Sequence, residues 1–439
     1  MEIFIKTVQL LLSLSILVIL HEFGHFFFAR VFNTRVEKFY LFFNPWFTLF
    51  KFKKGDTEYG VGWLPLGGYV KISGMIDESM DKEAMAQPAQ PWEFRAKPAW
   101  QRLLIMVGGV LVNFITALFI FWMILFKWGE SYVPVKSAQF GLHYHEVGKE
   151  IGLQDGDIVL TVDDLEVETT NDIAKFILLE DAENLTVKRG NQTVELSIPE
   201  DFDQTMIGQE VKNFAGIRFP TIVYKVVKGS HAADAGLQEG DSIVSVNGLS
   251  TVFFHELTAT LKANKDSEIH LDVYRGDSLV SLNSQVSAQG TLGFNPAGYG
   301  KYVDVKIFKY GFWEAFPKGI DMGFDILIGY VKQMKLIFTK EGAKQVGGFG
   351  AMGKLFDGTW DWQKFWFNTG LISLILAFMN ILPIPALDGG HVLFLLYEIV
   401  TGRKPGDKFM EYAQITGMVL LLGLLLFANG NDIFKAFIK

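Results

Sequence analysis

The 439-residue chain contains no cysteine. Disulfides are therefore excluded, and any metal site must be built from His, Asp and Glu. The chain also lacks a sustained run of Lys and Arg, and its net charge is −8, so nucleic acid is not expected as a partner. Apolar residues make up 49% of the chain, and they are unevenly distributed. Long apolar runs flank a polar middle, which is typical of a membrane protein that carries a soluble insertion.

Four segments are long and apolar enough to cross about 30 Å of hydrocarbon. We predict transmembrane helices over residues 1–30, 103–127, 365–401 and 409–437. The first is expected to be retained, because no small-residue cleavage site of a signal peptide follows it. Residues 316–338, within a predicted extracytoplasmic linker over 291–364, carry charges and are expected to form an amphipathic helix at the membrane interface.

The distribution of basic residues predicts the orientation. Lys and Arg are concentrated in the loop over residues 31–102 and in the short loop that holds Arg403, Lys404 and Lys408. Both loops should therefore be cytoplasmic, with both termini and the middle of the chain on the other side.

The polar middle contains a repeat. GLQDGD at 152–157 recurs as GLQEGD at 236–241, and each copy runs into alternating apolar positions, IVLTVDD and SIVSVNG. This pattern predicts two small strand-rich domains of one kind, over residues 130–212 and 213–290. The motif GL-x-x-GD-x-I-V-x-V-N-G resembles PDZ domains of bacterial membrane-associated proteases, and the copy with VDD in place of VNG departs from it.

The first apolar run ends in HEFGH, which places His21, Glu22 and His25 in a predicted membrane helix. An ionisable residue there costs about 2.5 kcal/mol or more at mid-bilayer, so it usually marks a site. The two histidines are one helical turn apart and can bind one Zn²⁺, and the adjacent glutamate can take a proton from a water molecule. The alternative is a histidine pair satisfied by neighbouring carbonyl groups, which would keep three polar residues in the membrane for no gain.

Two histidines leave a catalytic zinc one protein ligand short, and Glu22 cannot be both base and ligand. The best remaining candidate is Asp388, the only acidic residue between Asp361 and Glu398, in a stretch where two prolines interrupt the helix. Asp388 could instead be the N-cap of the helix that follows, a role worth about 1 kcal/mol. Asn380 could hydrogen-bond a substrate carbonyl or merely bridge two helices.

The cytoplasmic stretch EYGVGWLPLGGYVKISGM alternates apolar residues with glycines. It predicts a β-hairpin at about 58–75 with its turn near Leu66, Gly67 and Gly68. Gly67, Gly68 and Tyr69 are candidate substrate-binding residues, because a strand edge can pair with an unwound substrate and hold it extended. The alternative is a plain cytoplasmic hairpin.

HEFGH in a first helix, together with N-x-x-P-x-P-x-LDGGH near the end, resembles the site-2 protease family of intramembrane zinc metalloproteases. The hairpin stretch and FRAKPAWQRLLIMVGGVLVNF match this family as well. The resemblance covers nearly the whole chain and implies that His21, His25 and Asp388 bind zinc, that Glu22 is the catalytic base and that Asn380 contacts substrate. It further implies a hairpin that dips into a bacterial inner membrane, and PDZ-like domains on the periplasmic side. The implied substrates are single-pass proteins such as anti-sigma factors, already shortened by an external cut, and remnant signal peptides.

The predicted fold is therefore a polytopic α-helical membrane protein with about four transmembrane helices, a membrane-reentrant β-hairpin and two extracytoplasmic PDZ-like domains. The predicted function is intramembrane proteolysis by a zinc endopeptidase. A metal transporter and a membrane-anchored PDZ scaffold with a structural metal are the other candidates. However, H-E-x-x-H supplies a base that a transporter does not need, and structural zinc normally has four ligands, mostly Cys.

Overall fold

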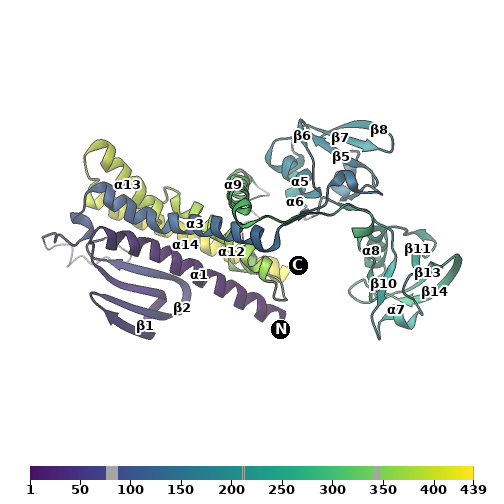
Figure 1. The fold of residues 1–439 in the computed structure, drawn as a ribbon, viewed down its shortest axis with the longest axis horizontal. Helices are drawn as coiled ribbons and strands as arrows, with labels where there is room; N and C mark the ends of the chain where they lie inside the picture. The colour runs from purple at the N-terminus through teal and green to yellow at the C-terminus, as the bar shows by residue number, and fades with distance from the viewer. Residues whose placement is uncertain (76–87, 210, 212, 340–341, 343–346, 439) are drawn as a thin grey trace. The chain divides into compact units, whose positions relative to one another are not determined.

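The computed structural model describes residues 1–75, 88–209, 211, 213–339, 342 and 347–438 (Figure 1). Parts of the predicted cytoplasmic loop (76–87), of the first predicted PDZ-like domain (210 and 212) and of the predicted linker (340–341 and 343–346) lie outside these residues. The chain forms two compact units. One comprises Met1–Gly129 and Lys309–Lys439, and the other is Glu130–Phe308.

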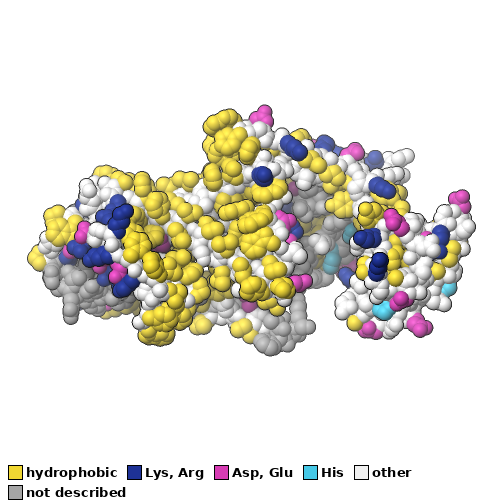
Figure 2. All heavy atoms as spheres, turned by 60° about the horizontal axis from the view of Figure 1, so that its bottom comes forward, with side chains coloured by type: hydrophobic (Ala, Val, Ile, Leu, Met, Phe, Trp, Pro, Cys, Tyr) yellow, Lys and Arg dark blue, Asp and Glu magenta, His cyan; other side chains and the backbone are white. Residues whose placement is uncertain are grey.

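Four helices in the described part of the chain are long and apolar enough to cross a membrane, which is the number predicted. They are α1 (Glu2–Val31), α3 (Ala99–Trp128), α12 (Trp362–Ile381) and the segment Lys408–Phe434 of α14 (Asp407–Ile438). Figure 2 shows a broad hydrophobic surface over the helices of this unit. Leu420 and Leu426, both on α14, are 63% and 72% exposed. Such a surface is expected where side chains face lipid.

The third predicted helix, over 365–401, is divided in two. α12 ends at Ile381, and α13 (Asp388–Thr401) begins only after Pro383 and Pro385. Proline has no backbone N–H and its ring clashes with the preceding turn, so the helix cannot continue through this segment. The break lies at the two prolines where the sequence predicted an interruption, and α12 provides the third candidate span.

Helix α3 lies at the centre of the helical unit. It packs against α1, α12, α13 and α9 (Phe312–Ile337). A Cβ atom at Gly24 of α1 would lie 2.2 Å from the carbonyl oxygen of Gly108 of α3, so only glycine permits this approach. Helix α9 likewise buries Ala315, Gly319 and Gly323. Small residues at helix crossings are typical of membrane proteins, in which close packing replaces the hydrophobic effect. The short elements η1 (Phe94–Ala96) and α11 (Phe349–Gly353) precede α3 and α12.

The sheet of this unit consists of β1 (Val36–Lys54) and β2 (Thr57–Ile72). Its register differs from the predicted hairpin over 58–75. Tyr40 of β1 pairs with Tyr69 on one side and with Gly60 on the other. The two halves of β2 are thus separated by β1, and the prediction that they pair with each other around Leu66–Gly68 is wrong. The pattern of the sequence identifies extended segments, whereas strand partners depend on long-range contacts.

The second unit contains two four-stranded sheets with corresponding strand orders, β6–β5–β7–β8 and β12–β11–β13–β14. The first half consists of β3 (Glu130–Tyr132), η2 (Val135–Ser137), β4 (Leu142–Tyr144), α4 (Glu146–Glu150), β5 (Ile158–Val162), β6 (Leu165–Glu166), α5 (Thr170–Leu179), β7 (Asn184–Arg189), β8 (Gln192–Ser197), α6 (Phe202–Gly208) and β9 (Ala215–Ile217). The second half consists of β10 (Val223–Val226), α7 (His231–Asp234), β11 (Ser242–Val246), β12 (Leu249–Ser250), α8 (Phe254–Ala263), β13 (Glu268–Arg275), β14 (Ser278–Gln285), β15 (Phe294–Pro296), η3 (Tyr299–Lys301) and β16 (Lys306–Phe308).

The repeated GLQ-x-GD motif has the same contacts in both halves. Asp157 is paired with Arg189 at 2.7 Å, and Asp241 with Arg275 at 2.7 Å; both carboxylates are almost fully buried. Each arginine also donates to the carbonyl oxygen of the glycine that opens the motif, Gly152 or Gly236 at the respective copy. The aspartate therefore joins the motif turn to the third strand of each sheet, which explains why the motif occurs twice.

The pairing of the outer strands extends the two halves beyond the predicted boundaries. β4 pairs with β9, which lies after residue 212, and β10 pairs with β15, which lies after residue 290. β3 pairs with β16, so the first and last strands of the unit are adjacent.

Polar and aromatic side chains connect the two halves. The rings of His143 and His255 stack with their centroids 4.5 Å apart, and Nε2 of His255 lies 3.3 Å from the Asp155 carboxylate. The Arg218 guanidinium lies 3.6 Å from the centre of the Phe253 ring. Burial of the imidazoles, followed by their mutual repulsion when charged, lowers the pKa of His143 to about 4, and burial also lowers the pKa of His255.

Candidate active site

The structure brings His21, His25 and Asp388 together. Nε2 of His21 lies 3.1 Å and Nε2 of His25 lies 3.3 Å from Oδ2 of Asp388, and the two Nε2 atoms are 3.2 Å apart. The three side chains are largely buried. Among the described residues, this is the one group of three or more His, Asp or Glu side chains whose ligand atoms converge.

These atoms have the spacing of metal ligands. Zinc binds nitrogen and oxygen ligands at about 2.0–2.2 Å, so two ligands of a tetrahedral ion are about 3.3–3.5 Å apart. Oδ2 of Asp388 is also buried without a hydrogen-bond partner in the described part of the chain. A carboxylate oxygen in that position is costly unless a cation or donor compensates it. The donor set, its spacing and this unpartnered oxygen all fit a zinc ion.

Helix α1 supplies the two histidines, and α3 orients one of them. Residues four apart lie on the same face of a helix, so both rings project from one side of α1. Nδ1 of His25 lies 2.8 Å from the carbonyl oxygen of Ile105. A neutral imidazole that donates from Nδ1 has its lone pair on Nε2, the atom that faces Asp388. The backbone of α3 therefore selects the tautomer that can bind a metal.

Gly109 of α3 leaves room for the two rings. A Cβ atom at this position would lie 2.4 Å from Nε2 of His25 and 2.7 Å from Cε1 of His21. Any larger residue would displace the imidazoles. Gly109 lies within the stretch FRAKPAWQRLLIMVGGVLVNF, but its sequence context does not mark it as a site residue.

Asp388 is placed by the break between α12 and α13. It is the first residue of α13, and Leu387 is the N-cap, so the N-cap alternative for Asp388 does not hold. A Cβ atom at Gly389 would lie 2.0 Å from the carbonyl oxygen of Leu382, which shows that the connection folds tightly over the start of α13. A buried ion pair between Arg102 of α3 and Glu398 joins α13 to the central helix at 2.5 Å.

Glu22 lies beside the cluster without belonging to it. The backbone of Val70 in β2 lies close to its carboxylate. A Cβ atom at Gly68 would lie 2.7 Å from Val18 Cγ1 and 3.5 Å from Glu22 Cγ. The Gly68–Val70 segment of β2 therefore runs directly against α1 next to the glutamate.

The other predicted substrate-binding residues occupy different positions. Tyr69 stacks on Tyr40 with ring centroids 5.3 Å apart, and its hydroxyl donates to Oδ1 of Asn44 at 3.0 Å. Gly67 has a φ of 149° and faces the Phe43 ring. Asn380 is half-buried near the end of α12, and the described residues give its side chain no hydrogen bond.

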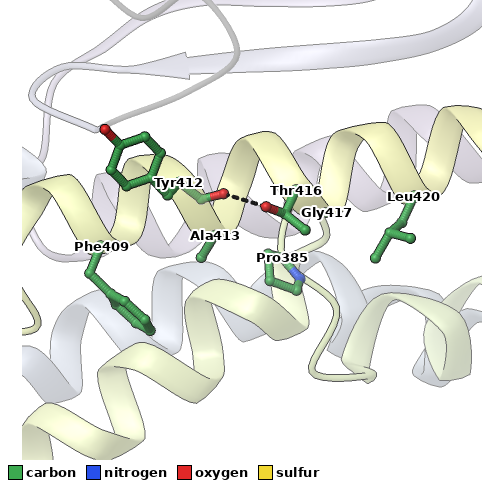
Figure 3. A pocket seen from close by; sticks show the side chains of 7 residues that line it. All are labelled: Pro385, Phe409, Tyr412, Ala413, Thr416, Gly417 and Leu420. Carbon is green, nitrogen blue, oxygen red and sulfur yellow. Dashed lines mark hydrogen bonds between the residues drawn. The ribbon is translucent and has the colours of Figure 1, made fainter.

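A pocket of about 300 Å³ lies on α14 beside the connection between α12 and α13 (Figure 3). Its lining is apolar, and Pro385 forms one wall. A Cβ atom at Gly417 of α14 would lie 1.8 Å from the Pro385 carbonyl oxygen, so α14 contacts this loop directly. None of the candidate catalytic residues lines the pocket.

Comparisons with known proteins identify the family of the chain. The sequence model of peptidase family M50 matches residues 9–424. A relative from Xylella fastidiosa, whose name refers to a zinc metalloprotease, is 29% identical over 97% of each chain. The regulator of sigma E protease of Haemophilus influenzae is 27% identical over 97% of this chain and 98% of its own. The regulator of sigma-E protease RseP of Salmonella typhimurium is 26% identical over 96% of this chain and 97% of its own. The chain belongs to peptidase family M50.

Proposed function

We propose that this protein is a zinc endopeptidase that cleaves transmembrane segments of other membrane proteins within the bilayer. The observation that supports this most directly is that His21 and His25, on a helix long enough to span a membrane, converge with Asp388 beside Glu22. The names of the relatives, which refer to zinc metalloproteases and to sigma-E regulation, support the metal and the substrate class. Single-pass proteins that resemble anti-sigma factors, and remnant signal peptides, are the proposed substrates.

The ligand residues and Glu22 have different roles in the proposed reaction. His21, His25 and Asp388 would hold zinc, which when bound supplies a Lewis acid that polarises the scissile carbonyl and lowers the pKa of a water molecule. Glu22 takes the proton from the attacking water and delivers it to the leaving amine. Because Glu22 is not one of the converging ligands, it is available for this role.

The Gly68–Val70 segment suits the binding of an extended substrate. The peptide bonds of a helix are hydrogen-bonded internally and shielded from attack, so a substrate helix must unwind before it is cut. A strand that lies against α1 beside Glu22 can pair with the unwound backbone and hold it at the site. We propose that β2 binds substrate in this way, as part of a membrane-reentrant element.

The competing functions account for fewer of these features. A metal transporter would need further ligands along a path, yet the described residues contain one ligand cluster. A structural zinc site is normally closed by four ligands, whereas three converge here. Neither function requires Glu22.

The decisive experiment uses purified protein, a model transmembrane substrate and the Glu22→Gln variant. We expect Glu22→Gln to retain zinc and fold but to lose cleavage, since the amide cannot accept the proton. Glu2→Gln makes the same change at the exposed start of α1 and should cleave normally. His21→Ala and Asp388→Ala should lose zinc as well as activity. Normal cleavage by Glu22→Gln would refute the mechanism.

We further propose that the two repeats of the second unit are PDZ-like domains on the periplasmic side. There they would exclude substrates that still carry a bulky external domain. Exclusion requires volume more than a binding groove, and the first repeat departs from the PDZ motif at Asp163 and Asp164. The alternative is that they recruit a newly exposed C-terminus by strand addition.

The pairing of β3 with β16 permits a clean deletion. Residues 133–305 can be removed and Tyr132 joined to Lys306 by a short Gly-Ser linker, which leaves a small hairpin in place of the unit. Under exclusion, the deletion variant cuts both a full-length substrate and its pre-shortened form, whereas the intact enzyme cuts only the shortened one. Poor cleavage of the shortened form by the deletion variant would support recruitment instead.

A further inference from the structure

Asn113 of α3 contacts His21 at Nδ1, the ring nitrogen that does not face Asp388. Its Nδ2 lies 3.3 Å from Nδ1 of His21. The Asn113 side chain is 1% exposed, and its Oδ1 has no hydrogen-bond partner in the described part of the chain. The backbone carbonyl of Asn113 is held separately, because it accepts a hydrogen bond from Oγ of Ser373 at 2.7 Å.

The two histidines of the cluster need the same tautomer to act as ligands through Nε2. In each ring Nδ1 must then carry the proton, and this N–H requires an acceptor. His25 has the carbonyl oxygen of Ile105 as its acceptor. Among the described residues, the Asn113 amide is the one hydrogen-bonding group that faces Nδ1 of His21, and Nδ2 of an amide is a donor.

A half-turn of the amide resolves this conflict. Rotation by about 180° about the Cβ–Cγ bond exchanges Oδ1 and Nδ2 in nearly the same positions, so the oxygen that lacks a partner comes to face His21. One end of the amide lacks a partner in either orientation. The tautomer of His21 therefore decides which of the two amide orientations is favoured. With a proton on Nδ1, the orientation that presents Oδ1 is favoured.

We propose that Asn113 is a positioning residue, which accepts a hydrogen bond from Nδ1–H of His21 and so holds this ring in the tautomer and orientation that bind zinc. The proposal rests on the proposed metal site. Helix α3 then orients both histidines of α1, through the Ile105 carbonyl and through the Asn113 side chain, while Gly109 between them leaves space for the rings.

The test compares three substitutions in the full-length protein in detergent. Asn113→Leu has nearly the same size and removes the acceptor. Asn113→Asp keeps an acceptor oxygen at the same position. Ser373→Ala removes the other hydrogen bond of Asn113 and leaves its amide intact, so it controls for a disturbance of α3 packing. Zinc affinity is measured by competition with a chromophoric chelator, and the geometry of the ligands by the visible absorption spectrum of the cobalt-substituted protein.

We expect Asn113→Leu to weaken zinc binding about 10- to 100-fold, the usual effect of removing a hydrogen-bond partner of a metal ligand, and to alter the cobalt spectrum. Asn113→Asp and Ser373→Ala should bind zinc within about threefold of the parent, by the same reasoning. If Asn113→Leu binds as tightly as the parent with the same spectrum, the proposal is wrong. If Asn113→Asp loses as much affinity as Asn113→Leu, the side chain acts by packing and the proposal is equally wrong. Failure of the parent protein to bind zinc would instead refute the proposed function.

Discussion

The geometry of the site predicts a large effect on zinc binding when Gly109 is substituted. Substitution by alanine adds one methyl group at the point where α3 passes the two imidazoles. The new Cβ would lie 2.4 Å from Nε2 of His25, the atom that faces Asp388. We expect Gly109→Ala to weaken zinc binding severely while the helical unit stays folded.

The size of the displacement follows from the contact distances. An ordinary contact of a Cβ atom begins at about 3.4 Å, so His25 Nε2 must move by about 1.0 Å (3.4 − 2.4). Zinc–ligand distances tolerate a deviation of only about 0.2 Å. The ring cannot move and still share an ion with His21 and Asp388, and we expect affinity to fall by more than about 100-fold. Alanine is favoured over glycine in a helix by about 0.8–1.0 kcal/mol, which offsets part of any loss of packing.

Zinc content by atomic absorption, cleavage of a model substrate and thermal unfolding in detergent test this prediction together. Leu111→Ala is the matched control, because it lies two residues away on α3 with a side chain that is 38% exposed. The control should retain zinc and activity. A Gly109→Ala protein that binds zinc as tightly as the parent would refute the reasoning from contact distances.

Three further predictions concern the other parts of the chain. The pKa values of His143 and His255 in the folded state lie below the unfolded value of about 6.5, so the contact between the two repeats is stable above that pH and weakens as the pH falls toward 4. Protection factors of the α8 amide hydrogens, which correct the exchange rates for their intrinsic pH dependence, should therefore be lower at pH 5 than at pH 7. His143→Phe, which keeps the stacked ring, should reduce the difference; equal protection factors at both pH values would contradict this. Gly68→Ala should slow cleavage of every substrate without loss of zinc, because its Cβ would lie 2.7 Å from Val18 and push β2 away from α1; unchanged turnover would argue against a role of this strand. Substrate helices with Pro or Gly near the scissile bond should be cut faster, because these residues destabilise a helix by about 3 and 1 kcal/mol; a preference for rigid helices would contradict strand pairing.

Local patterns in the sequence were sufficient for the elements that depend on near neighbours. The i, i+4 spacing of HEFGH placed His21 and His25 on one helix face, and apolar runs identified the four candidate spans. Asp388 was reached by elimination, because it is the one acidic residue in a long apolar stretch, and the structure places it 3.1 Å from His21. The repeat of GLQ-x-GD similarly predicted two related strand-rich halves, which have corresponding sheet orders.

Tertiary structure decided the features that depend on contacts between distant segments. β2 carries the alternation of an ordinary hairpin, but its two halves pair with opposite sides of β1, because strand partners depend on long-range contacts that a local pattern does not specify. The roles of Ile105, Gly109 and Asn113 likewise follow from the close crossing of α1 and α3 at Gly24 and Gly108. A carbonyl group, a missing side chain and an amide have no distinctive sequence signature. These groups contribute to a metal site only because α1 and α3 approach each other to within contact distance.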